Sequence, residues 1–140
     1  MGLTRFYDAR AGKDGPVSGA IIVIPVSFDD VANSETVEWS WTPPAGMEVT
    51  IVAINVHANA VTSDPTVTVG TSKAGTQIVA AANITTNLGN LTLKGTTAPV
   101  VTSANTLNVQ VVADSGDAAE AVSVTVVAYV SAPPTSLLLR

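Results

Sequence analysis

The feature that most constrains the fold of this chain is the dominance of β-branched residues, together with a near absence of helical periodicity. Val occurs 22 times and Thr 18 times among the 140 residues. β-branched side chains lose rotamer freedom in a helix and pack well on a pleated strand. We therefore expect an all-β protein. The sequence allows one short helix, around residues 118–121, and no long one.

Eight runs of strand-forming residues are separated by turn residues, such as Asp29-Asp30 and the rigid stretch 43–46. The runs are 20–28, 36–42, 47–60, 66–70, 76–82, 90–94, 105–113 and 121–130. Strands at this short, regular spacing, without crossover helices, predict an antiparallel sandwich or barrel. Eight strands suit a jelly roll, in which two sheets enclose one core.

Alternation within the runs predicts which side chains face that core. In the last two runs the inward residues are Leu107, Val109, Val111, Val122, Val124, Val126 and Ala128. The long third run has one face that is apolar throughout, formed by Val52, Ile54, Val56 and Ala58. Its other face changes character, from Val49, Ile51 and Ala53 to Asn55, His57 and Asn59. This change predicts that the strand leaves the core or passes under a neighbour.

Three parts follow from composition: an extended N-terminal arm (1–19), a β-sandwich domain (20–131) and a C-terminal tail (132–140). Residues 1–13 carry a charge of +2, whereas the net charge of the whole chain is −5. A basic arm on an acidic body suits docking onto an acidic surface of a neighbour. The alternative is a terminus whose charge is accidental. Aromatic and Arg side chains concentrate binding energy at interfaces. The candidate partner-binding residues of the arm are Arg5, Phe6, Tyr7, Arg10 and Lys13.

The tail combines the stiff Pro133-Pro134 element with three consecutive leucines, Leu137, Leu138 and Leu139. Burying a leucine side chain is worth roughly 1.5–3 kcal/mol, so these residues are candidates for partner binding. Two alternatives stay open: the leucines pack on their own sandwich, or they anchor in an adjacent chain.

Charged residues make up only 12% of the chain, about half the usual share of a soluble domain. Part of the surface is therefore expected to be covered by other subunits, in a homo-oligomer or a larger assembly. The acidic body would repel phosphate, so nucleic acid is not an expected partner. The longest apolar run, 20–26, is too short to span a bilayer, and charges occupy the place of a signal-peptide core. We expect no membrane contact and synthesis in a cytoplasm.

The chain offers little catalytic chemistry. His57 is its single histidine, cysteine is absent, and no nucleophile motif is present. The residues around His57, including Asn55, are poor ligands for transition metals. Asp114 and Asp117 fit a hairpin turn better than a calcium loop. We therefore expect no enzyme activity, no catalytic residue, no metal and no cofactor.

Two tryptophans share one face of the second run. Trp39 and Trp41, with the polar pair Asn55 and His57, form either a subunit interface or a glycan-binding face. Aromatic rings stack on sugars, but residues two apart on a strand also share a core face, and packing in the core or at an interface is the expected role.

The body resembles small β-sandwich virion proteins of tailed bacteriophages, particularly capsid decoration (cement) proteins and head-fibre bases. The resemblance is carried by the cysteine-free, Ala/Val/Thr-rich composition and by the runs 64–71, 113–117 and 122–130. It implies a jelly-roll-like sandwich that forms a homotrimer on the capsid surface, with terminal arms on the major capsid protein. The implied function is to stabilise the virion by cross-bridging capsid subunits. The alternative is a carbohydrate- or receptor-binding sandwich of a head fibre or tail tip.

Overall fold

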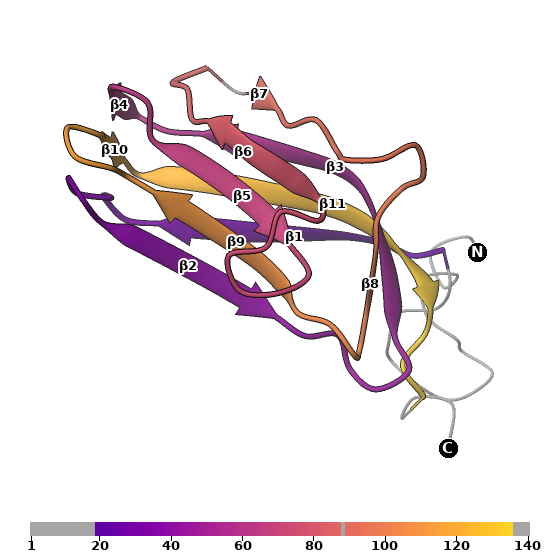
Figure 1. Cartoon of the computed structure of the whole chain (residues 1–140). Helices are drawn as coiled ribbons and strands as arrows, with labels where there is room; N and C mark the ends of the chain where they lie inside the picture. The colour runs from indigo at the N-terminus through magenta and orange to yellow at the C-terminus, as the bar shows by residue number, and fades with distance from the viewer. Residues whose placement is uncertain (1–18, 88, 136–140) are drawn as a thin grey trace.

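A computed structural model describes residues 19–87 and 89–135. Figure 1 shows an all-β body, as the sequence predicted. Its strands are β1 (Ile21–Phe28), β2 (Thr36–Trp41), β3 (Glu48–His57), β4 (Ala60–Thr62), β5 (Thr66–Gly70), β6 (Val79–Asn83), β7 (Gly89–Asn90), β8 (Val100–Thr102), β9 (Leu107–Val112), β10 (Ala118–Glu120) and β11 (Val122–Ala132).

The strands form two main sheets that face each other as a sandwich (Figure 1). The first sheet has the order β1-β11-β3-β7, and β8 also pairs with β3. The second has the order β2-β9-β5-β6, and a two-stranded sheet of β10 and β4 lies at one end. Every strand pair in the described residues is antiparallel. The predicted antiparallel sandwich is therefore confirmed.

The core lies between the two main sheets and consists almost wholly of aliphatic side chains. Alternate residues of β11, from Val122 to Val130, are 0–1% exposed. Leu107, Val109 and Val111 on β9 face them from the second sheet and are fully buried. The inward faces predicted for these two strands are confirmed. The central strands are covered on their inner side, which fixes the register of each sheet.

The change from apolar to polar residues along one face of the third run has a different cause from the one expected. It does not come from the strand leaving the core. A β-bulge interrupts the pairing of β3 with β11, between the Val127–Ala53 and Ala128–Ile51 pairs. The extra residue brings Ile51 and Ile54 onto the same inner face, where both are 0% exposed, and leaves Val52 46% exposed. The strand therefore stays in the core along its length, and Val52 does not share a face with Ile54.

Residues 118–121 form no helix. Residues 118–120 are β10, which pairs with β4, and Ala121 turns the chain into β11 with a φ of 48°. Ala and Glu favour helices in isolation, but pairing with β4 overrides that weak preference. The third run ends as a strand at His57, and its last residue, Ala60, begins β4. β8 was not predicted, and of the sixth run (90–94) only Asn90 lies in a strand, β7.

Both terminal segments join the sandwich at one end. Ile21, the first residue of β1, pairs with Tyr129 near the end of β11, and the amide of Gly19 donates to the carbonyl of Val130. Thr135 is held by its amide and Oγ1, which donate to the carbonyl of Ala45 at 2.8 and 2.9 Å. Most of the predicted arm, and Leu137, Leu138 and Leu139 of the tail, lie outside the described residues.

Candidate assembly surfaces

The described residues contain no cluster that could bind a metal ion. Among them, no group of three or more His, Cys, Asp or Glu side chains could hold a metal ion. His57 lies on the outer side of β3, opposite Ser123 of β11. In the described ranges, no helix has the length and apolar character needed to cross a membrane.

The outer side of the first sheet is exposed and apolar. The large hydrophobic side chains exposed in the described residues are Ile21 (54%), Val23 (58%), Val52 (46%) and Val100 (41%). All four lie on this side, and we call the surface around them the apolar face. One row of it crosses four strands, because Tyr129 pairs with both Ile21 and Thr50, and Thr50 pairs with Val100.

The apolar face continues into a neutral polar part. There, Thr125 of β11 pairs with Pro25 and Asn55, and Asn55 pairs with Asn90. The Oδ1 atom of Asn55 is buried and has no hydrogen-bond partner. A buried acceptor without a partner is unfavourable by about 1–3 kcal/mol, and burial within the chain itself also shields this atom from other molecules. The rows in register with β1 hold no Asp, Glu, Lys or Arg, and Glu48 lies one row beyond them.

The outer side of the second sheet differs, because the β5–β6 loop packs over part of it, although the outward residues of β2 remain exposed. Lys73 in this loop lies 3.5 Å from a carboxylate oxygen of Glu38 on β2. The amide of Ala74 donates to Oδ1 of Asn108 on β9 at 3.3 Å, and Asn108 is only 3% exposed. Part of this sheet therefore has a cover from its own chain. The apolar face is exposed at Ile21, Val23, Val52 and Val100 but not throughout, because Thr50 in the same row is only 5% exposed.

The structure does not bring the two tryptophans together with Asn55 and His57. Trp39 and Trp41 lie on β2 of the second sheet, opposite Val109 and Leu107, and pack against the core as partly buried side chains. Asn55 and His57 lie on β3 of the first sheet and face outward. The four residues therefore form no common platform for a sugar ring.

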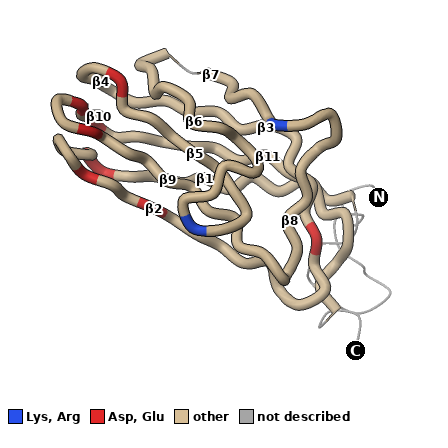
Figure 2. The backbone as a smooth tube through the Cα atoms, in the orientation of Figure 1, with Lys and Arg blue, Asp and Glu red and all other residues tan. Residues whose placement is uncertain are grey.

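Most of the acidic residues lie in the loops and short strands at the end of the sandwich that holds β4 and β10 (Figure 2). They are Asp29, Asp30, Glu35, Asp64, Asp114, Asp117 and Glu120. Several have structural roles in turns. Oδ1 of Asp117 accepts from the amide of Asp64, and its Oδ2 accepts from the amide of Asp114, each at 3.2 Å. The body thus has an acidic end and, opposite it, an end at which Gly19 and Thr135, the first and last described residues, lie.

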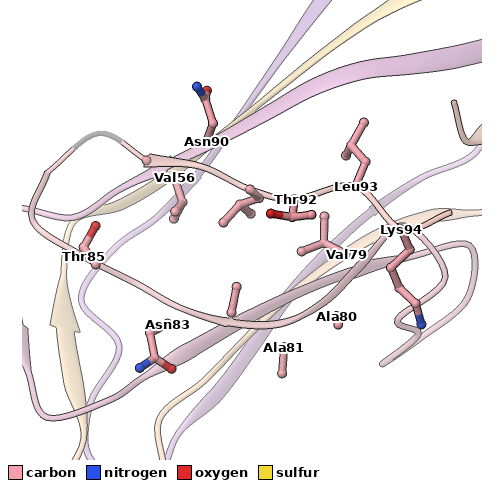
Figure 3. Close-up of a pocket in the computed structure, with 13 residues that line it drawn as sticks. Val56, Val79, Ala80, Ala81, Asn83, Thr85, Asn90, Thr92, Leu93 and Lys94 are labelled. Atoms are coloured by element: carbon pink, nitrogen blue, oxygen red, sulfur yellow. The ribbon is translucent and has the colours of Figure 1, made fainter. Parts of the chain in front are cut away.

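A cavity of about 510 Å³ opens between β6 and residues 89–94, where the edges of the two sheets part. Its lining is mainly aliphatic, from Val79 and Ala80 on one side to Leu93 on the other (Figure 3). The polar side chains of Asn83 and Lys94 point away from the middle of the cavity rather than toward a common centre. This arrangement holds no acid–base pair.

Sequence reasoning missed the exposed members of the apolar face. A signal was present, because the run 20–26 is apolar on both sides instead of alternating. Such a run is typical of a strand buried on both faces. β1 is an edge strand of the first sheet, and its outer side has no cover among the described residues.

Comparison with known proteins supports the fold. No protein-family model matches the chain, and no curated protein matches it. A solved structure of the cyanophage Pam1 capsid asymmetric unit contains a similar chain, with a TM-score of 0.52 and 20% sequence identity. The similarity covers 88% of this chain and 96% of that chain. At this identity, the comparison shows a shared fold.

Proposed function

We propose that this chain is a structural virion protein that binds an assembled phage capsid and stabilises it by cross-bridging its subunits. The observation that carries the proposal is the fold shared with almost the full length of a chain from a phage capsid. The lack of a metal-binding cluster in the described residues and the low content of charged residues are consistent with assembly rather than catalysis. Its site of action is then the capsid surface, and its partner is the major capsid protein.

The connectivity supports this assignment. Consecutive strands repeatedly cross from one sheet to the other: β1, β3 and β11 lie in the first sheet, and β2, β5 and β9 lie in the second. We interpret β1-β11-β3-β7 and β2-β9-β5-β6 as the two sheets of a jelly roll, with β8 as a fifth strand that pairs with β3 beside β7 in the first sheet. β4 and β10, which are far apart in the sequence, then form an additional two-stranded antiparallel sheet at one end. Jelly rolls occur widely in viral capsids, so this topology agrees with a role in a virion.

The polarity of the body suggests how it is oriented. The arm and the tail join the sandwich at one end, and the acidic loops lie at the other (Figures 1 and 2). In the proposed arrangement the terminal end faces the shell. The basic arm and the apolar tail contact capsid subunits, while the acidic end points outward. Self-association, with a homotrimer favoured, places several arms on one shell, and repeated contacts then give avidity that a single contact lacks.

The test is deletion of residues 1–13, followed by co-sedimentation with shells assembled from the major capsid protein of the same phage. We expect the truncated chain to remain folded and to lose binding. The matched control is the double variant Lys73→Gln/Lys94→Gln, which removes the same net charge of +2 from the body. Lys73 contributes only an exposed ion pair to Glu38, so this control should fold and bind normally. Full binding by the truncated chain would contradict the proposal.

A further inference from the structure

The edge strands of the two main sheets differ in how open they are to a further strand. An edge strand presents unpaired amide and carbonyl groups, and proteins usually blunt it with a proline, a β-bulge or a short length. β7 and β8 have only two and three residues. The pairing of β6 with β5 is irregular between Val67 and Val69, and the amide of Lys94 donates to the carbonyl of Ile78 just before β6 begins. These three edges are therefore poor templates for another strand.

The free edge of β1 is interrupted by Pro25. The amide of Val130 donates to the carbonyl of Ala20, so by alternation residues 21, 23, 25 and 27 direct their backbone groups away from β11. Pro25 has no amide hydrogen to offer there, and this breaks the pairing pattern of the edge. A further strand cannot pair continuously along β1.

β2, at the margin of the second sheet, has none of these features (Figure 1). Its six residues, Thr36–Trp41, include no proline and pair with β9 in one unbroken register. The same register continues past both ends of the strand. The amide of Ala113 donates to the carbonyl of Glu35 at 2.9 Å, and the hydroxyls of Thr42 and Thr106 lie 3.0 Å apart. β2 is therefore a regular edge that its neighbour holds in place.

The free side of β2 offers a ladder of backbone hydrogen-bonding groups. Because the carbonyl of Glu35 accepts from β9, the odd-numbered residues of β2 direct their backbone groups toward β9. Thr36, Glu38 and Ser40 direct theirs away from it, and no strand of the described residues pairs with them. All three residues are exposed. An extended peptide segment adds to such an edge through main-chain hydrogen bonds.

The inner side of β2 indicates apolar residues in an added strand. Trp39 and Trp41 pack against the core from this side, but they are only partly buried at the edge of the sheet. Side chains of an added strand that lie opposite the odd-numbered residues of β2 would stand beside these two rings. Tryptophan is enriched among the residues that carry most of the binding energy at interfaces. Apolar side chains at these alternate positions therefore fit the edge.

The outer side of β2 indicates basic residues at the other positions. Glu38 lies in the middle of the strand, and Glu35 directly precedes it. The ion pair of Glu38 with Lys73 is 3.5 Å long, and the Lys73 side chain is 79% exposed, so this pair contributes little. Opposite charges directly across two strands stabilise their pairing, and like charges destabilise it. A basic strand is therefore better suited than a second copy of β2, which would add two more glutamates.

We propose that β2 accepts an extended segment of another polypeptide as an additional strand of the second sheet. In this segment, apolar residues that contact Trp39 and Trp41 alternate with basic residues that face Glu38. The inference goes beyond the proposed function, because it assigns a binding edge to the described body and not to the arm or the tail. Binding at this edge requires no capsid, so the two proposals succeed or fail separately.

The experiment measures the binding of a synthetic peptide, in which lysine and valine alternate over eight residues, to the full chain. Trp39 and Trp41 are the only tryptophans of the chain, and both lie on β2, so their fluorescence reports on this edge. We expect their emission to shift to shorter wavelength as the bound peptide covers the rings. The control peptide has the same composition but carries all its lysines before its valines. It should bind much more weakly, because it is equally basic but does not alternate.

Ser40→Pro is the test variant, because it removes an outward amide and leaves the hydrogen bonds between β2 and β9 intact. Ser40→Ala is the matched control, because it loses the same hydroxyl and keeps the amide. We expect Ser40→Ala to bind the alternating peptide like the wild type. Ser40→Pro should bind it at least about tenfold more weakly, since a hydrogen bond is lost and the proline ring obstructs the added strand.

Circular dichroism must show that Ser40→Pro is folded, and Glu38→Lys takes its place if it is not. Glu38→Lys changes an exposed side chain and should bind the alternating lysine peptide more weakly and an alternating glutamate–valine peptide more tightly. The inference is overturned if the alternating and control peptides bind equally, or if Ser40→Pro binds like Ser40→Ala. Self-association through β2 that excludes the peptide would also overturn it, because the occupant would then be a second copy.

Discussion

The bulge in β3 decides which residues of this strand stabilise the sandwich, and three threonine substitutions test it. Ile51→Thr, Ile54→Thr and Val52→Thr all keep a β-branched side chain, so strand propensity hardly changes. Ile51 and Ile54 are 0% exposed, whereas Val52 is 46% exposed. Each isoleucine variant loses about two buried carbon groups, at about 0.8 kcal/mol each, and buries a hydroxyl without a partner, at about 1–3 kcal/mol.

The expected loss in the free energy of unfolding is therefore roughly 3–5 kcal/mol for Ile51→Thr and for Ile54→Thr. For Val52→Thr it is within about 0.5 kcal/mol, as for other surface substitutions. The assay is urea unfolding followed by the fluorescence of Trp39 and Trp41, which pack against the core. Protein concentration must be the same for all variants, because self-association adds to apparent stability. The reasoning is refuted if Ile51→Thr is as mild as Val52→Thr, since an uninterrupted strand would place Ile51 and Ile54 on opposite faces.

Two further substitutions test contacts of the second sheet and of the terminal end. Gly46 has a φ of 81°, and a Cβ atom there would meet the side chain of Thr135, so Gly46→Ala should lower the free energy of unfolding by about 1–3 kcal/mol. Gly116→Ala is its control in thermal melts, because Gly116 has a φ of 96° and open space around it; equal effects would show that the Thr135 contact is unimportant. Trp41→Ala should destabilise the body by about 2–4 kcal/mol, because its ring packs against the core, and a glycan array should show no binding by the wild type. Glycan binding that Trp41→Ala abolishes without loss of stability would instead support a sugar site.

Much of the fold could be predicted from the sequence, because the alternation of apolar and polar residues along a strand is a local signal. The inward faces of β9 and β11 follow from the alternation of Val and Leu with polar residues, and β5 has the predicted bounds. The bulge at Val52 could not be predicted, because it shifts the pairing between two strands that are about 70 residues apart in the sequence. β10 was missed for the same reason: its pairing with β4 outweighs the helix preference of Ala and Glu.

The candidate site could be predicted from the sequence only in part. The low content of charged residues predicted that other subunits cover part of the surface, but it did not indicate which part. That depends on β1 being an edge strand of the first sheet and on the loop around Lys73 covering part of the other sheet. The sequence offers Trp39 and Asn55 as members of one common face, but they lie on different sheets, because β2 belongs to the second sheet and β3 to the first. The roles of the arm and the tail stay predictions that the experiments above address.

The most direct test of the account is the thermal disassembly of capsid shells with and without the full chain. Light scattering would follow shells of the major capsid protein at saturating concentrations of the chain. Cross-bridging predicts a disassembly temperature that rises with occupancy and returns to the value of bare shells when residues 1–13 are deleted. An unchanged disassembly temperature on fully occupied shells would contradict the claim that this chain stabilises a virion.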